Sequence, residues 1–367
     1  MQGFIIPAGG VGGGAPDVSV LLECLSLRHE VTYHNRCLPK VGPMSRPEQF
    51  INRRRFLNQS LTASLAASVW GSSAASAEPG RNAENYIDIH VHLAQKWYGD
   101  KHGPLTARQL LRWMDAKKIT RAAVLPLVSP EAFWYPVTTE FVLRETEPHR
   151  DRLIPFCAID PRALATHLTD DQQVVDMLRR YRDAGARGFG EHKPMLAIDN
   201  PLNMRLYSAC HEVQLPVLFH LDNKANMDRP GLPGLAKALE AFPTLAFIGH
   251  GKGWWASIAG GLSQADLHVG YPKGHVAAGG AIDRLMERHD NLYGDLSSSG
   301  AHAVLRDRVF GREFLVRRAD RLLFGTDYYD LTQIDFQQFN LFQEFRLPAD
   351  VQRKISHDNA QRLLASE

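Results

Sequence analysis

Two histidines separated by one residue lie in the segment YIDIHVH (86–92), where Asp88, His90 and His92 alternate with aliphatic residues. In an extended strand this alternation places the three polar side chains on one face and the aliphatic ones on the other. We expect the aliphatic face to pack against a helix layer and the polar face to point into the interior. There, two imidazoles two residues apart can bind one divalent ion at about 2.0–2.1 Å.

Further ligand-type side chains end four later strand-like segments. They are Glu191 with Lys193 in GFGEHK, His220, His250, and Asp327 in FGTD. A single buried histidine is usually a core residue with its own hydrogen-bond partner. If all of these side chains were core residues, each would need its own hydrogen-bond partner in a dry interior. The set therefore favours a metal site over core packing.

Eight short segments rich in β-branched and aromatic residues must position these side chains. Amphipathic stretches with helical spacing separate them, and this alternation favours parallel strands joined by helical crossovers. The predicted fold is a (β/α)8 TIM barrel, which typically needs about 250 residues and carries its site at the carboxyl ends of its strands. The predicted strands are 86–92, 121–128, 153–160, 186–193, 215–222, 245–251, 291–298 and 321–329.

The connection after the sixth predicted strand is longer than the others. We expect its extra residues, 251–275, to form a loop or short helices that cover the active site.

Composition excludes several classes of protein. Of 367 residues, 44% are hydrophobic and 22% are charged, which argues against a disordered chain, a collagen-like repeat or a coiled coil. Lys and Arg total 42 against 40 Asp and Glu, so no general field favours nucleic acid or anionic lipid. The four cysteines contain no CxxC pair, which argues against a disulfide scaffold or a cysteine zinc cluster. We expect Cys157 and Cys210 to be buried thiols.

The first 77 residues have the composition of an export signal. Arg53, Arg54 and Arg55 precede an uncharged stretch, 61–70, and a small-residue site of the A-x-A type at 75–77. The uncharged stretch is too short to span a bilayer stably. The segment resembles a twin-arginine signal peptide, with Arg53 and Arg54 as the pair. A basic amphipathic first helix is the alternative.

This interpretation divides the chain into two parts. Residues 1–77 form a leader, cleaved after Ala77, and residues 78–367 form the barrel. Because about 50 residues precede the arginines, we expect the true start at Met44 and an exported, periplasmic protein.

The order of these motifs resembles the amidohydrolase-related family, in the branch that contains aminocarboxymuconate semialdehyde decarboxylase. The resemblance covers roughly residues 86–365 and includes a closing NAQRLL at 359–364. It implies the same barrel fold and a divalent metal, with His250 as the acid/base that transfers the proton. The metal ligands that it implies are His90, His92, His220 and Asp327.

The fourth predicted strand departs from the family pattern. In binuclear members of the superfamily a carboxylated lysine or a glutamate from this strand bridges two metals, whereas the decarboxylase-like branch commonly uses one. Glu191 and Lys193 share a face, so either could be a ligand. In the alternative, Lys193 binds a substrate carboxylate and Glu191 positions it.

Several other residues have two interpretations. Asp88 orients a ligand or caps a barrel layer, and Asp295 hydrogen-bonds His250 or caps a helix near Ser299. Lys252 and Trp254, in the long connection, line a substrate pocket or simply pack. Three further histidines are predicted to be surface or helix residues: His192, His211 and His289.

Imidazoles with a carboxylate suit Zn²⁺, although manganese, iron or cobalt fit similar ligands. One ion is favoured and two are possible. Such an ion activates a bound water, and Asp327 and His250 transfer its proton, which predicts hydrolysis of an amide, lactone or ester of a small acidic substrate. The alternatives are a metal-dependent decarboxylase of an unsaturated or aromatic acid, and an exported protein that binds a small acid without turnover. Small molecules are the expected partners, without nucleic acid, and the sequence does not indicate an oligomeric state.

Overall fold

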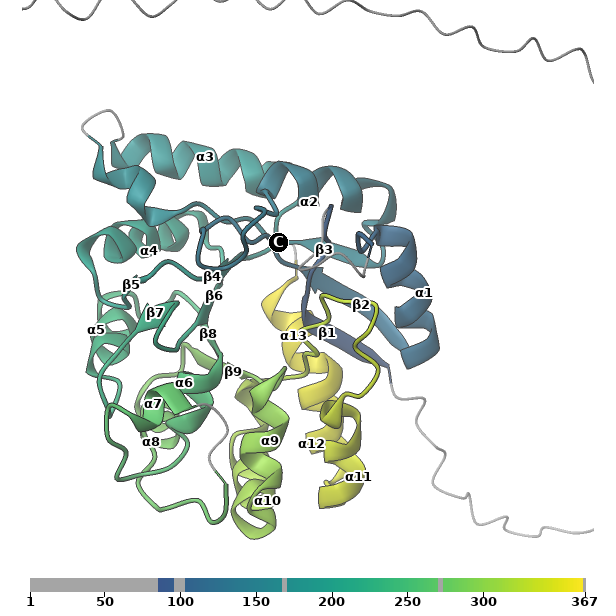
Figure 1. Cartoon of the computed structure of the whole chain (residues 1–367), viewed down its shortest axis with the longest axis vertical. Coiled ribbons are helices and arrows are strands. Elements are labelled where there is room, and N and C mark those ends of the chain that lie inside the picture. The colour runs from purple at the N-terminus through teal and green to yellow at the C-terminus, as the bar shows by residue number, and fades with distance from the viewer. Residues whose placement is uncertain (1–84, 96–102, 167–169, 270–272, 366–367) are drawn as a thin grey trace, which may run out of the picture. The chain divides into compact units, whose positions relative to one another are not determined.

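Eight parallel strands form a barrel in the computed structural model, which describes residues 85–95, 103–166, 170–269 and 273–365 (Figure 1). The predicted leader, residues 1–77, lies outside the described residues. Each predicted strand is present, although shorter than its sequence segment. The strands are β1 (Tyr86–Val91), β2 (Ile119–Val124), β3 (Leu153–Pro155), β4 (Phe189–His192), β6 (Val217–His220), β8 (Phe247–His250), β9 (Leu292–Asp295) and β10 (Leu322–Leu323).

Parallel bridges close the barrel at two places. The strands form one sheet in the order β1-β2-β3 and another in the order β10-β9-β8-β6-β4. Parallel bridges join Cys157 to Phe189 and Val91 to Tyr328, so that β3 meets β4 and β1 meets the end of β10. The predicted (β/α)8 barrel is therefore confirmed. Two short strands, β5 (Leu196–Ala197) and β7 (Asn226–Met227), pair outside the barrel sheets.

Helices follow the strands and surround them (Figure 1). Local sequence signals set several boundaries: Thr106 and Asp170 each begin a helix with a capping box, in which the cap side chain accepts the N–H of a glutamine three residues later. The helices are α1 (Ala107–Lys117), α2 (Thr139–Thr146), α3 (Asp171–Asp183), α4 (Pro201–Val213), α5 (Pro233–Ala241), α6 (Lys252–Ala256), α7 (Asp266–Val269), α8 (Ala281–Arg288), α9 (Ser299–Leu305), α10 (Arg308–Arg317), α11 (Leu341–Phe345), α12 (Ala349–Arg353) and α13 (Asn359–Leu363).

The barrel interior holds its own apolar cluster, separate from the large cluster between strands and helices. Ile87 and Ile89 belong to the interior cluster with residues of five other strands, whereas Val91 packs in the outer one. The expectation that the aliphatic face of the first strand packs as a unit against helices is therefore wrong. A register shift between Asp88 and Val91 interrupts the period-two alternation on which it depended.

The long connection after β8 forms the short helices α6 and α7, as expected. The two cysteines within the described residues, Cys157 and Cys210, are buried free thiols. Among the described residues, the structure contains no helix with the length and apolar character needed to cross a membrane.

Candidate active site

Four side chains converge at the carboxyl ends of the strands. His90 ends the polar part of β1, His92 follows it, Glu191 lies on β4, and Asp327 follows β10. The Nε2 atoms of the two histidines lie 3.1 Å apart. The Oε2 atom of Glu191 lies 3.6 Å from the Nε2 of His90 and 3.5 Å from that of His92. The Oδ1 atom of Asp327 lies at 3.7 and 3.6 Å from the same two nitrogens.

These distances allow the two histidines to bind a single metal ion together with either carboxylate. Two ligands bound at 2.0–2.1 Å in tetrahedral geometry lie about 3.3 Å from each other. The five separations, from 3.1 to 3.7 Å, lie near that value. Nitrogen and carboxylate donors are also the ligands of a zinc or manganese site.

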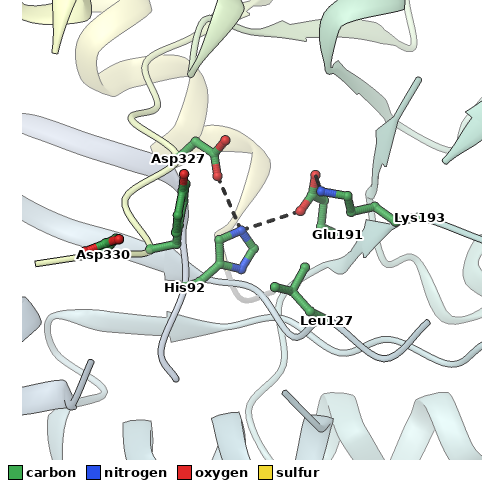
Figure 2. A pocket seen from close by; sticks show the side chains of 7 residues that line it. His92, Leu127, Glu191, Lys193, Asp327 and Asp330 are labelled. Atoms are coloured by element: carbon green, nitrogen blue, oxygen red, sulfur yellow. Dashed lines mark ion pairs between the residues drawn. The ribbon is translucent and has the colours of Figure 1, made fainter. Parts of the chain in front are cut away.

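The tautomer of His92 suits this role. Its Nδ1 lies 2.9 Å from the carbonyl oxygen of Leu125, which can only accept a hydrogen bond. The proton therefore lies on Nδ1, and Nε2 directs a lone pair toward Glu191 and Asp327 (Figure 2).

Glu191 faces two groups of histidines. Its Oε2 faces His90 and His92, whereas its Oε1 lies 2.7 Å from the Nδ1 of His220 and 3.6 Å from the Nε2 of His250. The side chain is buried, which alone would raise its pKa. Lys193, His220 and His90 outweigh burial and hold the pKa of Glu191 well below its usual value. A carboxylate in this position can bind one ion or bridge two.

His220 lies between two carboxylates. Its two ring nitrogens contact the carboxylates of Glu191, at 2.7 Å, and of Asp222, at 2.9 Å. The backbone packs closely on this ring, since a Cβ on Gly251 would lie 2.7 Å from its Cδ2 atom. Sequence reasoning missed Asp222, although its spacing of two residues from His220 repeats the spacing of the HxH motif.

His250 contacts the carboxylate of Asp295, one of the two interpretations that the sequence left open for that residue. Its Nδ1 lies 3.1 Å from Oδ2 of Asp295 and 2.9 Å from the hydroxyl of Ser297, and its Nε2 lies 3.9 Å from Oδ2 of Asp327. Burial and the neighbouring His90 lower the pKa of His250, which keeps the imidazole neutral and able to accept a proton. Ser297 was missed, although it follows Asp295 at the same spacing of two.

Asp88 supports the backbone below the site rather than a ring. Its Oδ1 accepts the backbone N–H groups of His90 and Thr326, both at 3.0 Å, and its Oδ2 accepts the Thr326 hydroxyl at 2.6 Å. Burial raises the pKa of Asp88 to about 7. It thus joins β1 to the segment that follows β10, and these two parts of the chain carry His90, His92 and Asp327.

A pocket of about 430 Å³ opens beside the candidate ligands His92, Glu191 and Asp327 (Figure 2). Lys193 lines it and pairs with Glu191, with its Nζ 3.2 Å from Oε1. The complete lining is His92, Leu127, Glu191, Lys193, Asp327, Tyr329 and Asp330.

The other two residues predicted to bind substrate do not line this pocket. Lys252 is exposed at the start of α6. Trp254 is fully buried against Phe219 and Trp255, and it fills the space over Gly249, where a Cβ would lie 2.4 Å from the indole. The structure therefore corrects the prediction of Trp254 as a pocket residue: it is part of the core.

His192 is also not a surface or helix residue. It lies buried on β4, where its Nε2 contacts the side-chain oxygen of Asn203 at 2.9 Å, and burial lowers its pKa to about 4. Asn203 in turn donates to Asn226, whose side-chain amide donates to the backbone carbonyl of His192. This network holds β4 beside β7 and leaves the Glu191 side chain on the opposite face.

Comparisons with known proteins concern the family and the fold. The sequence model of a family described as Amidohydrolase matches residues 87–365. The fold is similar to that of a probable 2-pyrone-4,6-dicarboxylic acid hydrolase of Acinetobacter baumannii, with a TM-score of 0.51, 13% identity, and 76% of this chain and 99% of that chain covered. A 2,6-dihydroxybenzoate decarboxylase from Rhizobium gives a TM-score of 0.46 and 17% identity, with 77% and 98% of the two chains covered. A search among curated proteins finds no match.

Proposed function

Because the chain belongs to the amidohydrolase family of metal-dependent enzymes, we propose that it hydrolyses an amide, lactone or ester bond of a small acidic molecule. The family match confirms the resemblance that the sequence indicated. The observation that carries this proposal is the convergence of His90, His92 and Asp327, of which His92 and Asp327 line the pocket. The likeness to solved structures supports the barrel alone.

We propose that His90, His92, Glu191 and Asp327 hold one divalent ion, with Zn²⁺ as the favoured metal. When bound there, the ion would act as a Lewis acid that polarises the substrate carbonyl and favours ionisation of water. His220 then acts through Glu191 and keeps that carboxylate in place.

A second ion is the alternative arrangement. The side chains that would hold it are Glu191, through Oε1, with His220 and His250. The orientation of the two Glu191 oxygens toward different histidine groups favours it. The metal content of variants at His250 separates the two arrangements, because His250 is a base in one and a ligand in the other.

Proton transfer in the proposed reaction belongs to His250 and Asp327. The neutral His250 presents Nε2 to the site and accepts the proton of the attacking water, then returns it to the leaving group. Asp327 directs one oxygen to the HxH pair and the other to His250, so it can orient that water.

Lys193 is the reason for proposing an acidic substrate. It is the cation among the side chains that line the pocket, and its ammonium group lies beside Glu191. A carboxylate of the substrate can share this ammonium and so place a neighbouring carbonyl over the HxH pair.

The same side chains also suit a decarboxylase of an unsaturated or aromatic acid, since ligands do not fix the reaction. Lys193 favours this second candidate equally, because both reactions begin with an acid. The test is a panel of lactones, amides, esters and unsaturated acids, assayed with and without added Zn²⁺. Ring or amide cleavage supports the hydrolase, and release of carbon dioxide supports the decarboxylase. Binding of the acids with no turnover of any member contradicts both and supports a binding protein.

A further inference from the structure

Asp295 links two side chains that the proposed function gives different tasks. It ends β9 and is completely buried. Its Oδ2 atom lies 2.7 Å from the Nδ1 of His90 and 3.1 Å from the Nδ1 of His250. The two imidazole rings lie 4.3 Å apart between their centroids. One carboxylate oxygen therefore contacts a candidate metal ligand and the candidate acid/base.

These contacts determine which nitrogen of each ring carries a proton. An ionised carboxylate can only accept, so His90 must donate from Nδ1 to Asp295. His250 must also donate from Nδ1, because its neighbours there are Asp295 and, at 2.9 Å, the Ser297 hydroxyl that donates to the same carboxylate oxygen. The Nε2 atoms are then left for the site: that of His90 faces Glu191 and Asp327, and that of His250 lies 3.6 Å from Glu191.

The surrounding structure holds Asp295 in this orientation. Ser297 donates its backbone N–H to Oδ1 at 2.8 Å and its hydroxyl to Oδ2 at 2.7 Å. The indole N–H of Trp255 donates to the backbone carbonyl of Asp295 at 2.8 Å. A Cβ on Gly325 would lie 2.4 Å from Oδ1, so the glycine of FGTD leaves the space that this carboxylate occupies.

We infer that Asp295 is a shared positioning residue, which fixes the tautomers of His90 and His250 together and so couples metal affinity to proton transfer. This inference rests on the proposed metal site but not on the identity of the substrate. Its specific consequence is that one substitution at Asp295 changes two histidines at once.

Asp295→Asn tests this coupling. The asparagine amide can take two orientations. In one, its NH2 group faces the two imidazoles and the Ser297 hydroxyl, and in the other it faces the Ser297 backbone N–H. Each orientation therefore places a donor against donors. Asp88→Asn is the matched control. There the Asn oxygen can still accept from the backbone N–H groups of His90 and Thr326, and its NH2 can donate to the Thr326 hydroxyl.

The experiment measures Zn²⁺ affinity of the full chain by competition with a chromophoric chelator, together with nitrogen-15 spectra of the histidine side chains in the Zn²⁺-loaded protein. We expect Asp295→Asn to weaken Zn²⁺ binding roughly 10–100-fold, the usual cost of losing a group that orients a ligand. We expect the His90 and His250 resonances to change together. Asp88→Asn should keep the wild-type affinity and the wild-type tautomers of both rings.

Three results would overturn the inference: unchanged affinity in Asp295→Asn, a change in only one of the two rings, or an equal loss of affinity in Asp88→Asn. The wild-type spectrum decides even if Asp295→Asn does not fold, because a proton on Nε2 of either ring contradicts the proposed arrangement. Failure of the wild-type chain to bind Zn²⁺ at all would instead contradict the proposed metal site.

Discussion

The Nε2 atoms of His90 and His92 lie 3.1 Å apart, and the Nδ1 atom of each ring contacts a group that accepts a hydrogen bond. Both Nε2 atoms therefore face the same small space. Two lone pairs at this distance repel each other unless a proton or a cation lies near them. With Glu191 and Asp327 beside them, the space has the electrostatic character of a cation site.

We expect Asp327→Asn to lower the catalytic rate by roughly 10²–10⁴-fold, as for loss of a proton-transfer group, while metal is partly retained. Asparagine suits the position because Asp327 has a φ of 60°, in the left-handed region that Asn also tolerates. If Asp327 were only a capping residue, turnover would stay near normal and stability would fall by about 1 kcal/mol. Metal content, melting temperature and rate, measured on this one variant, distinguish the two roles.

His250→Ala should keep one ion per chain and lose turnover, because His250 is assigned to proton transfer rather than to ligation. The measurement is inductively coupled plasma mass spectrometry alongside the activity assay. Loss of one ion out of two would support the two-ion arrangement. A loss of metal as complete as in His92→Ala would show that the assignment of His250 as a base is wrong.

Lys193→Met should raise the KM for an acidic substrate roughly tenfold, the cost of losing a hydrogen bond of about 1.5 kcal/mol to a charged group. The KM for the neutral methyl ester of the same compound should change much less. Lys252→Met is the control, because this second predicted lysine is exposed and does not line the pocket. Equal effects on the acid and its ester would remove Lys193 from substrate recognition.

The proposed export signal can be tested by substituting its arginines. We propose that residues 1–77 direct export by the twin-arginine route, so the double variant Arg53→Lys with Arg54→Lys should remain unprocessed inside the cell. Arg55→Lys, outside the pair, should be processed normally after Ala77. N-terminal sequencing of the exported protein checks both, and normal export of the double variant would contradict the proposal.

The sequence predicted which strand ends carry polar side chains, because the alternation of strands and helices determines where each strand ends. Apart from the contact of Asp295 with His250, which it left as one of two interpretations, it did not predict the partners of those side chains. Asp295 and His90 are 205 residues apart, and only the closed barrel brings them within 2.7 Å. Trp254 was misinterpreted for a similar reason: its place in the core depends on the space over Gly249, which local sequence does not show.

The most direct test of the metal site compares the metal content of the wild-type chain with that of His92→Ala. Both proteins are stripped with a chelator, incubated with excess Zn²⁺, freed of unbound ion and analysed by inductively coupled plasma mass spectrometry. We expect wild type to retain at least one ion per chain, and His92→Ala, which lacks one of the four converging donors, to retain almost none. A wild-type chain that retains no Zn²⁺, or a variant that retains as much as wild type, would contradict the proposed site.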